Sequence, residues 1–285
     1  MTATALRRPE FAALHRPGHP FLLPNAWDVA SALLIGQAGF PAVGTTSLGV
    51  TAAAGLVDGA GTGRACTLAL AAAVGSRLAV PFSVDIEAGY SDDPDAVAGL
   101  AAELASLGAA GINLEDAAAG ARLRPVAAQA AIIRSVVAAA PVLFVNARTD
   151  TYWLSYGPQD GRLAETITRL RAYADAGASG AFVPGCTDVR VVSALTSSVP
   201  VPLNVLWQPG VQTRPLAEAG VARISTGSAP YRRALAAGLA TAVAARDGGQ
   251  PPEPDLPYAA VLELLAPRVA ANPDQGSVST PRSSA

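Results

Sequence analysis

Short apolar runs alternate with longer alanine-rich stretches along most of the chain. The runs are rich in β-branched or other apolar residues and are too short for helices, which is typical of buried strands. Eight of them occur, at residues 21–25, 41–47, 81–87, 110–116, 142–149, 180–185, 201–206 and 221–227.

The stretches between these runs have the periodicity of helices. Gly108 and Gly177 each follow one of them and suit the left-handed residue at which many helices end. The helices that we expect cover residues 28–38, 64–77, 93–107, 125–139, 160–176 and 229–245.

Alternating strands and helices predict a parallel sheet, and eight units predict its closure into a (β/α)8 TIM barrel. An open doubly wound sheet is the competing fold, but its G-x-G-x-x-G fingerprint does not follow the first run. We expect a catalytic barrel at 1–246 and a linker with a C-terminal helix (258–269) at 247–271. The polar residues 272–285 are expected to be a disordered tail.

Composition limits the partners and the compartment. A net charge of −2 gives no electrostatic case for nucleic acid. The alanine-rich runs are interrupted before they reach membrane-spanning length, and the first 20 residues lack a signal-peptide core. Two cysteines, Cys66 and Cys186, do not make a disulfide framework. We therefore expect a cytoplasmic protein without a membrane or nucleic-acid partner.

The absence of lysine and the scarcity of histidine exclude several chemistries. All 20 positively charged residues are arginine, so neither a Schiff-base lysine nor a Walker phosphate loop is present. The only histidines, His15 and His19, stand near the N-terminus, where we expect them on the surface. A histidine-ligated zinc site in the barrel is therefore excluded. A metal there would rely on carboxylates, which favours Mg²⁺ or Mn²⁺.

Acidic residues follow two neighbouring predicted strands, at the barrel end where active sites lie. Asp85 and Glu87 are two apart, so a continuous strand would point both carboxylates inward, with Glu115 beside them. Such a cluster repels itself unless a cation sits in it, which predicts a metal site. The alternative is that Glu87 and Asp116 are solvated loop charges or helix caps.

Other polar groups at the strand ends are candidates for substrate binding. Arg148 could hold a carboxylate or an enolate oxygen, or form a structural ion pair with Asp150 or Glu115. The segment 45–47 (Thr45, Thr46 and Ser47) could cradle an anion or be a polar turn. Asp58 lies in residues 48–63, a connection long enough to be a binding loop or lid. Cys186 is interpreted as a small buried hydrophobe rather than a nucleophile.

Six motifs occur in a characteristic order along the chain. They are PNAWD (24–28), GTTS (44–47), VDIEAGY (84–90), GINLEDA (111–117), NARTD (146–150) and FVPG (182–185). This ordered set resembles the isocitrate lyase/phosphoenolpyruvate mutase superfamily, in its carboxyphosphonoenolpyruvate phosphonomutase-like branch. The similarity covers roughly residues 20–245, almost the whole predicted barrel.

The resemblance implies Mg²⁺ or Mn²⁺, an enolate intermediate and a small 2-oxo or 2-hydroxy acid. It also implies a homodimer or homotetramer, often with the eighth helix swapped between subunits. By motif, Asp85, Glu87 and Glu115 resemble the metal positions and Arg148 the arginine that stabilises the oxyanion. The matched substrate contacts are Trp27, Thr45, Thr46, Ser47 and Asn204, with Asp58 on the loop near the metal and Glu115 in a further catalytic role.

Two departures from the family pattern stand out. The lyases of isocitrate and methylisocitrate carry a Lys-Lys-Cys-Gly-His motif after strand four, where this chain reads DAAAGARLRP (116–125). Those lyases also place a Glu after the strand-six proline, where this chain has Gly185. Both changes argue against a tricarboxylic substrate. Arg122 or Arg124 could supply cations in the loop, but neither can act as a base at neutral pH.

The sequence therefore supports three functions. The leading hypothesis is a Mg²⁺-dependent lyase that cleaves a C–C bond through an enolate. The alternatives are C–P chemistry on phosphonopyruvate or phosphoenolpyruvate, and a catalytically silent protein that binds 2-oxo acids. The general base stays open among Tyr90, Asp58, a metal-bound water and the substrate itself.

Overall fold

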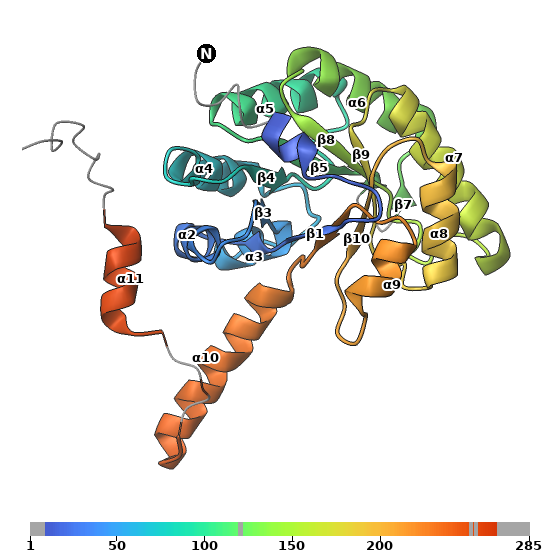
Figure 1. The fold of residues 1–285 in the computed structure, drawn as a ribbon. Coiled ribbons are helices and arrows are strands. Elements are labelled where there is room, and N and C mark those ends of the chain that lie inside the picture. Colours follow the sequence, from blue (N-terminus) through green and yellow to red (C-terminus); the bar gives the residue numbers. More distant parts are fainter. Residues whose placement is uncertain (1–8, 119–121, 251–252, 254–255, 267–285) are drawn as a thin grey trace, which may run out of the picture.

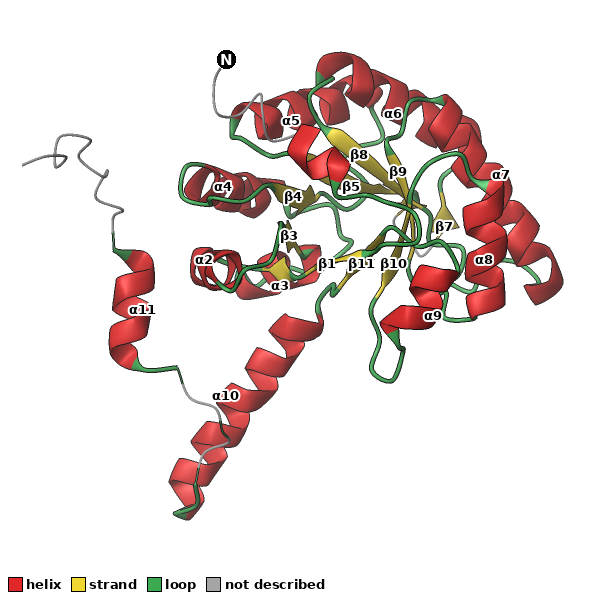
Figure 2. Cartoon of the chain, in the orientation of Figure 1, coloured by secondary structure: helices red, strands yellow, loops and turns green. Residues whose placement is uncertain are grey.

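The computed structural model describes residues 9–118, 122–250, 253 and 256–266. Strands surround a central axis and helices cover them on the outside (Figures 1 and 2). The barrel sheet is parallel throughout, in the order β1-β11-β10-β9-β8-β5-β4-β3-β2. The predicted (β/α)8 barrel is confirmed.

Every predicted apolar run contains a barrel strand. The strands are β1 (Phe21–Leu23), β2 (Asn25–Ala26), β3 (Val43–Thr45), β4 (Phe82–Asp85), β5 (Gly111–Glu115), β8 (Phe144–Arg148), β9 (Gly180–Val183), β10 (Leu203–Leu206) and β11 (Arg223–Ser225). A separate antiparallel hairpin joins β6 (Ala117–Ala118) to β7 (Arg122–Leu123).

Pro24 divides the first barrel strand into two pieces. β1 pairs with β11, whereas β2 pairs with β3 on the other side. Proline has no N–H to donate to a ladder, so the pairing changes partner at this residue. The two pieces act together as one strand and close the ring.

The helices are α2 (Val29–Gln37), α3 (Ser47–Ala53), α4 (Arg64–Gly75), α5 (Pro94–Ser106), α6 (Val126–Ala139), α7 (Gln159–Asp175), α8 (Val189–Ser198), α9 (Thr213–Glu218), α10 (Ala229–Asp247) and α11 (Tyr258–Leu265). The six helices predicted between the strands agree closely with α2, α4, α5, α6, α7 and α10, whereas α3, α8 and α9 were not among those predicted. Gly108 and Gly177 have φ of 92° and 102°, which confirms their left-handed conformation after α5 and α7.

Two predicted segments, at 48–63 and 258–269, differ in part from the structure. The prediction of a long connection at 48–63 is wrong in its first half. α3 continues to Ala53 and leaves a shorter loop before α4. The C-terminal helix forms as α11, which packs on α2. Its predicted last residues and the tail at 272–285 lie outside the described residues.

The amino-terminal end of the barrel is closed by an aromatic cluster. The helical residues 9–13 carry Phe11, whose ring centroid lies 5.6 Å from that of Phe144 at the start of β8. His15 stacks on Phe144 at 4.0 Å and its Nδ1 lies 2.9 Å from the Phe11 carbonyl oxygen. His15 is therefore buried, with 8% exposed, and its predicted surface position is wrong. His19 is exposed, as predicted.

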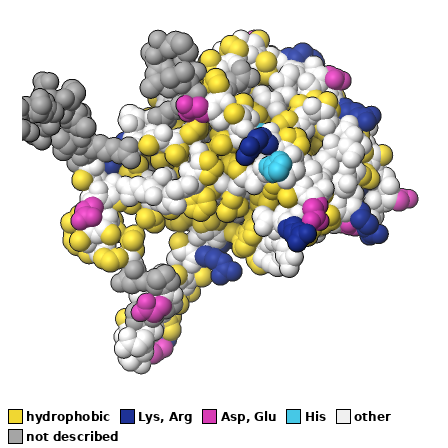
Figure 3. Space-filling model, viewed as in Figure 1, with side chains coloured by type: hydrophobic (Ala, Val, Ile, Leu, Met, Phe, Trp, Pro, Cys, Tyr) yellow, Lys and Arg dark blue, Asp and Glu magenta, His cyan; other side chains and the backbone are white. Residues whose placement is uncertain are grey.

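The last barrel helix projects away from the body of the molecule. α10 runs outward from the barrel (Figure 1), and Tyr231 in its first turns is its only buried residue. Hydrophobic side chains spread over the surface beside its root (Figure 3). Leu235, Leu239 and Val243 on the helix are themselves 57%, 68% and 39% exposed. None of the helices in the described ranges combines the length and apolarity needed to cross a membrane.

Candidate active site

A cavity of about 100 Å³ opens where the barrel strands end at their carboxyl termini. Five of the predicted site residues line it: Thr46, Ser47, Asp58, Asp85 and Arg148. Residues to which the sequence assigned no role complete the wall, among them Asn25, Asn113, Trp153, Phe182 and Ser225.

A second cavity of about 190 Å³ contains the other predicted acidic residues. Glu87 and Glu115 line it together with Tyr90, Arg124 and residues 59–61 of the loop after α3. The predicted acidic cluster is thus divided between two neighbouring cavities, and the contact between Glu115 and Arg148 connects them.

Asp85, the last residue of β4, is held by the neighbouring strand and helix. Its backbone N–H donates to Thr45 Oγ1 at 2.9 Å, and its Oδ2 accepts from the Ser47 N–H at 3.2 Å. Ser47 is the first residue of α3, where backbone N–H groups lack helical partners and favour an anion. The other oxygen, Asp85 Oδ1, is buried and has no hydrogen-bond partner among the described residues.

Glu87 lies beyond the end of β4, in a backbone conformation that is rare for a residue with a side chain. Its φ is 50°, so the alternation of a strand does not extend to it, and the prediction that it shares one face with Asp85 on a continuous strand is wrong. The side chain is nevertheless buried, which excludes the alternative of a solvated charge. Burial, with Asp58 and Asp85 nearby, raises the pKa of Glu87 to about 7.

The loop before α4 covers the Glu87 carboxyl. A Cβ added at Gly63 would lie 3.0 Å from Glu87 Oε1 and 2.8 Å from Thr51 Cγ2, so this backbone approaches too closely for a side chain. Glu87 Oε1 is buried without a partner among the described residues, like Asp85 Oδ1. Two buried carboxylate oxygens therefore lack a donor at neighbouring positions.

These two oxygens suit a hard divalent cation. Mg²⁺ binds carboxylate oxygens and keeps several waters, so it does not require a complete protein cage. In the described part of the chain, no three acidic, His or Cys side chains stand together as a ligand set. Glu115 is directed elsewhere, because its Oε2 lies 2.8 Å from Arg148 Nη1. The donors available to a cation are thus Asp85 Oδ1 and Glu87 Oε1.

Arg148 at the end of β8 is held between two carboxylates. Its Nε and Nη2 donate to the two oxygens of Asp150 at 2.7 Å and 3.1 Å, while Nη1 contacts Glu115. The sequence suggested a pair with one or the other, and the structure contains both. Burial alone would lower the pKa of Arg148, but Glu115 and Asp150 raise it, so the guanidinium stays charged. Burial raises the pKa of the Glu115 carboxyl, an effect that Arg148 opposes.

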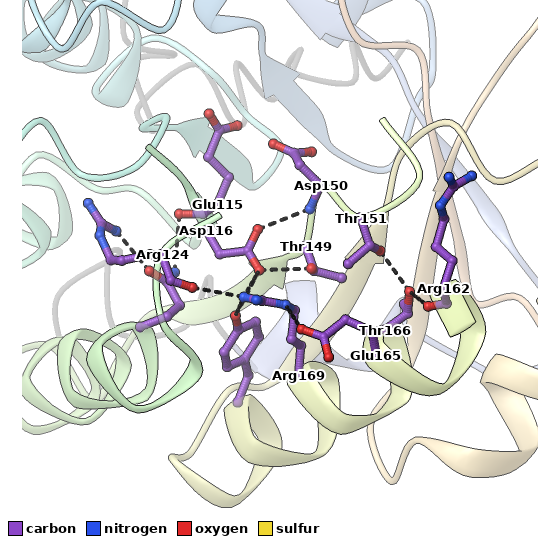
Figure 4. Close-up of polar contacts among 12 residues, drawn as sticks. Glu115, Asp116, Arg124, Thr149, Asp150, Thr151, Arg162, Glu165, Thr166 and Arg169 are labelled. Atoms are coloured by element: carbon purple, nitrogen blue, oxygen red, sulfur yellow. Dashed lines mark hydrogen bonds and ion pairs between the residues drawn. The ribbon is translucent and has the colours of Figure 1, made fainter. Parts of the chain in front are cut away.

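Asp116 anchors Asp150 from below, through contacts that Figure 4 shows. Its carboxylate accepts from the Asp150 N–H at 3.0 Å and from Thr149 Oγ1 at 2.8 Å. Tyr173 Oη and Arg169 Nη1 of α7 donate to it at 2.7 Å and 3.2 Å. Asp116 is fully buried, so the alternative of a solvated charge is excluded here too. It fixes the turn that presents Arg148.

Two candidates for the general base differ in their setting. Asp58 lies on the exposed loop after α3, yet burial of its carboxyl raises its pKa, and a hydrogen bond with Ser47 opposes the rise. Tyr90 Oη lies 2.9 Å from Thr67 Oγ1, and burial raises the pKa of the phenol above its usual range. Asp58 is therefore the better placed of the two to exchange a proton near neutral pH.

Three predicted substrate contacts do not line the cavity. Thr45 accepts from the Asp85 N–H and so acts through Asp85. Asn204 is buried, and its Nδ2 donates to Ser225 Oγ at 3.2 Å. The Trp27 ring packs against Tyr231 at 5.5 Å between centroids.

Two further sequence interpretations concern the margins of the site. Arg124 is not a free loop cation, because its guanidinium contacts Asp92 at 2.7 Å and donates to Gln129 Oε1 at 2.8 Å. Cys186 is buried, as predicted, and burial raises the pKa of its thiol to about 12.

The chain belongs to the phosphoenolpyruvate phosphomutase family, whose model matches residues 11–246. An uncharacterised Mycobacterium tuberculosis protein is 47% identical over 255 residues, which cover 90% of this chain and 95% of the relative. The 2-methylisocitrate lyase of Bacillus subtilis is 32% identical over 190 residues, covering 64% of this chain and 60% of that enzyme.

Solved structures share the fold. A candidate phosphonomutase from Burkholderia cenocepacia is 39% identical and superposes with a TM-score of 0.79, covering 83% of this chain and 98% of that one. A phosphonopyruvate hydrolase in complex with oxalate and Mg²⁺ has a TM-score of 0.76 at 24% identity, covering 93% and 95%. The chain thus lies in a superfamily of lyases, mutases and hydrolases, as its motifs indicated.

Proposed function

We propose that this protein is a Mg²⁺-dependent lyase that cleaves a C–C bond of a small 2-oxo or 2-hydroxy carboxylate through an enolate. The observation that carries the proposal is a small cavity lined by both Arg148 and Asp85, whose Oδ1 is buried without a hydrogen-bond partner among the described residues. Its volume of about 100 Å³ suits a compact acid. Pockets for drug-sized ligands are larger, at roughly 300–1,000 Å³.

The metal would be held by Asp85 Oδ1 and Glu87 Oε1, with Glu115 acting at a distance. When bound, the ion supplies positive charge next to the oxygens of the substrate and balances the carboxylates of Asp58, Asp85 and Glu87. That balance explains how three acidic groups can lie close enough to raise the pKa of Glu87. The solved complex of a phosphonopyruvate hydrolase of the same fold with oxalate and Mg²⁺ supports the assignment.

Arg148 is proposed to stabilise the charge that develops on the substrate. Its contacts with Asp150 and Glu115 engage three of the five N–H donors of a guanidinium. Within the described residues, two donors remain for an oxyanion in the cavity. Because both carboxylates hold the guanidinium in place, little reorganisation is needed when the enolate forms.

Proton transfer is assigned to Asp58. Its carboxyl lines the cavity, and its raised pKa brings it closer to neutral pH than an ordinary aspartate. Thr46 and Ser47 would bind the substrate carboxylate at the start of α3. Trp153 and Phe182 supply apolar walls that limit water around the enolate.

C–P bond chemistry on phosphonopyruvate or phosphoenolpyruvate is the second candidate. It is favoured by the phosphonomutase-like relative from Burkholderia cenocepacia and by the name of the matching family. The same enolate, the same cation and the same arginine would serve a phosphoryl leaving group. The two candidates therefore differ in the substrate and not in the groups that stabilise charge.

Proton and phosphorus NMR of a substrate panel, with and without Mg²⁺, tests the proposal. The panel contains oxaloacetate, isocitrate, methylisocitrate, a dialkylmalate and phosphonopyruvate. We expect Mg²⁺-dependent loss of one C–C substrate, with an unchanged phosphorus spectrum. Loss of phosphonopyruvate would instead support the second candidate. Tight binding without turnover of any compound would favour a silent binding protein and contradict both.

A further inference from the structure

A buried arginine lies beneath the candidate site, inside the barrel. Arg223 begins β11 and is 0% exposed. Its Nη2 donates to Asn113 Oδ1 at 3.1 Å, and its Cζ lies 6.0 Å from the centroid of the Phe11 ring. Nε and Nη1 have no hydrogen-bond partner among the described residues. Burying a cation with few hydrogen-bond partners costs folding free energy, which suggests that Arg223 has a role other than stability. Burial lowers the pKa of Arg223 to about 9, and it remains charged at neutral pH.

The contact with Arg223 fixes the orientation of the Asn113 amide. A guanidinium has donors and no acceptor, so the atom that faces it must be the amide oxygen. Asn146 Nδ2 on the neighbouring strand β8 donates to the same oxygen at 2.9 Å. With both lone pairs of Oδ1 engaged, the amide cannot rotate by 180° without losing two hydrogen bonds. Its NH₂ group must therefore point away from Arg223.

On the side away from Arg223, Asn113 borders the cavity. Asn113 lines the cavity with Asp85 and Arg148, and it is the register partner of Asp85 across β4 and β5. No described residue accepts a hydrogen bond from Asn113 Nδ2 in the structure. An amide donor thus faces the space between the proposed metal ligand and the oxyanion-binding arginine.

We propose that Asn113 contacts the substrate, donating a hydrogen bond from Nδ2 to a carboxylate or keto oxygen, and that Arg223 is the positioning residue that fixes this amide. The inference rests on the proposed function, because it uses the same cavity and the same small acid. It adds a neutral donor between two charged groups of the wall, Asp85 and Arg148.

The test measures oxalate binding in the presence of Mg²⁺ by calorimetry. Asn113→Asp keeps the acceptor that Arg223 and Asn146 need and replaces the NH₂ donor by an oxygen. Asn113→Ala removes the donor without adding charge. Arg223→Met removes the positioning contact, and Arg223→Lys retains a donor. Ser83→Ala is the matched control, because the Ser83 hydroxyl is buried in the barrel without a partner among the described residues.

We expect both Asn113 variants to bind oxalate roughly 10- to 100-fold more weakly, as for loss of a hydrogen bond to a charged group. Arg223→Met should weaken binding, Arg223→Lys should restore it in part, and Ser83→Ala should match the wild type. Thermal melts identify variants that fail to fold, and two substitutions at each position keep the test decisive. If folded Asn113 variants bind oxalate as the wild type does, the inference is wrong and the proposed function stands. If the wild type itself does not bind oxalate with Mg²⁺, both are contradicted.

A purely structural role for Arg223 predicts a different pattern. Removing it would then lower the melting temperature of the protein but leave the Kd for oxalate of the folded protein unchanged. Parallel loss of affinity in Arg223→Met and the Asn113 variants, with recovery in Arg223→Lys, distinguishes positioning from stability. An unchanged Kd in folded Arg223→Met would overturn the role given to Arg223.

Discussion

At the scale of single residues, Arg148 shows how a charged side chain is prepared for chemistry. The carboxylates of Glu115 and Asp150 hold its guanidinium. Asp116 accepts a hydrogen bond from the Asp150 N–H and so fixes the backbone at Asp150. A lysine could replace the charge but not the fork of donors that reaches both Asp150 oxygens. The geometry of Arg148, and not only its charge, is therefore the property that we expect to matter.

Arg148→Lys should reduce kcat by roughly 100- to 1,000-fold, the usual cost of losing an oriented donor to a developing oxyanion. The affinity for Mg²⁺ should change little, because Arg148 is not a proposed ligand. Arg190→Lys is the matched control, since Arg190 also pairs with a carboxylate two residues away, Asp188, but its side chain is 93% exposed. Steady-state kinetics on the substrate found by NMR measures both. Equal kcat in Arg148→Lys and wild type would remove Arg148 from the mechanism.

At the scale of elements, α10 is a long helix that runs away from the barrel. Leu235, Leu239 and Val243 recur every four residues and make an exposed apolar stripe along it. Such a stripe usually marks a contact surface. We propose that it packs against a second copy of the chain, in keeping with the expected homodimer or homotetramer.

Leu239→Glu should therefore shift the protein toward smaller species in light scattering coupled to size-exclusion chromatography, because it buries a charge in the contact. Thr241→Glu adds the same charge two residues further on, on a different side of the helix, and should leave the assembly unchanged. A wild type that is monomeric at all concentrations would contradict the proposal directly.

The amino-terminal segment gives a prediction about pH. Burial lowers the pKa of His15 from 6.5 to about 3, and Arg223 adds to the effect. As the pH falls below 6.5, the unfolded chain takes up the proton first, so the free energy of unfolding decreases until about pH 3. His15 thus contributes stability above pH 6.5 that is lost on acidification.

Replacing His15 by phenylalanine should flatten the decline of the unfolding free energy between pH 6.5 and about 3. His19→Phe should not, because His19 is exposed. Urea denaturation at a series of pH values measures the difference, and other titrating groups cancel in the comparison. The same slope in wild type and His15→Phe would show that His15 takes up its proton as readily in the folded protein as in the unfolded chain, and would contradict the prediction.

At the scale of the whole molecule, the barrel could be predicted because its pattern is local. Most strand residues of the apolar runs are buried, and the helices between them have their own periodicity and Gly caps. The division of the first strand depends on Pro24, so it too could have been predicted from the sequence. Helix α3 was missed, because Gly49 and Thr51 lower its helix propensity.

The site could be predicted only in part. Strand ends gave Asp85, Arg148, Thr46 and Ser47, because residues at corresponding ends of parallel strands meet in a barrel. Glu87 was placed by a rule for strands that fails at its left-handed backbone. The contact of Arg223 with Asn113 joins positions 110 residues apart, and no local sequence pattern predicts it.

The central claim is that Asp85 and Glu87 carry a divalent cation beside Arg148. Calorimetric titration of Mg²⁺ into wild type and Asp85→Asn tests it most directly, with Asp95→Asn on the exposed first turn of α5 as control. The account predicts binding to wild type and to Asp95→Asn, and at least roughly tenfold weaker binding to Asp85→Asn, whose amide offers no charge to the ion. Equal Mg²⁺ affinity in Asp85→Asn and wild type would place the cation elsewhere and contradict the account.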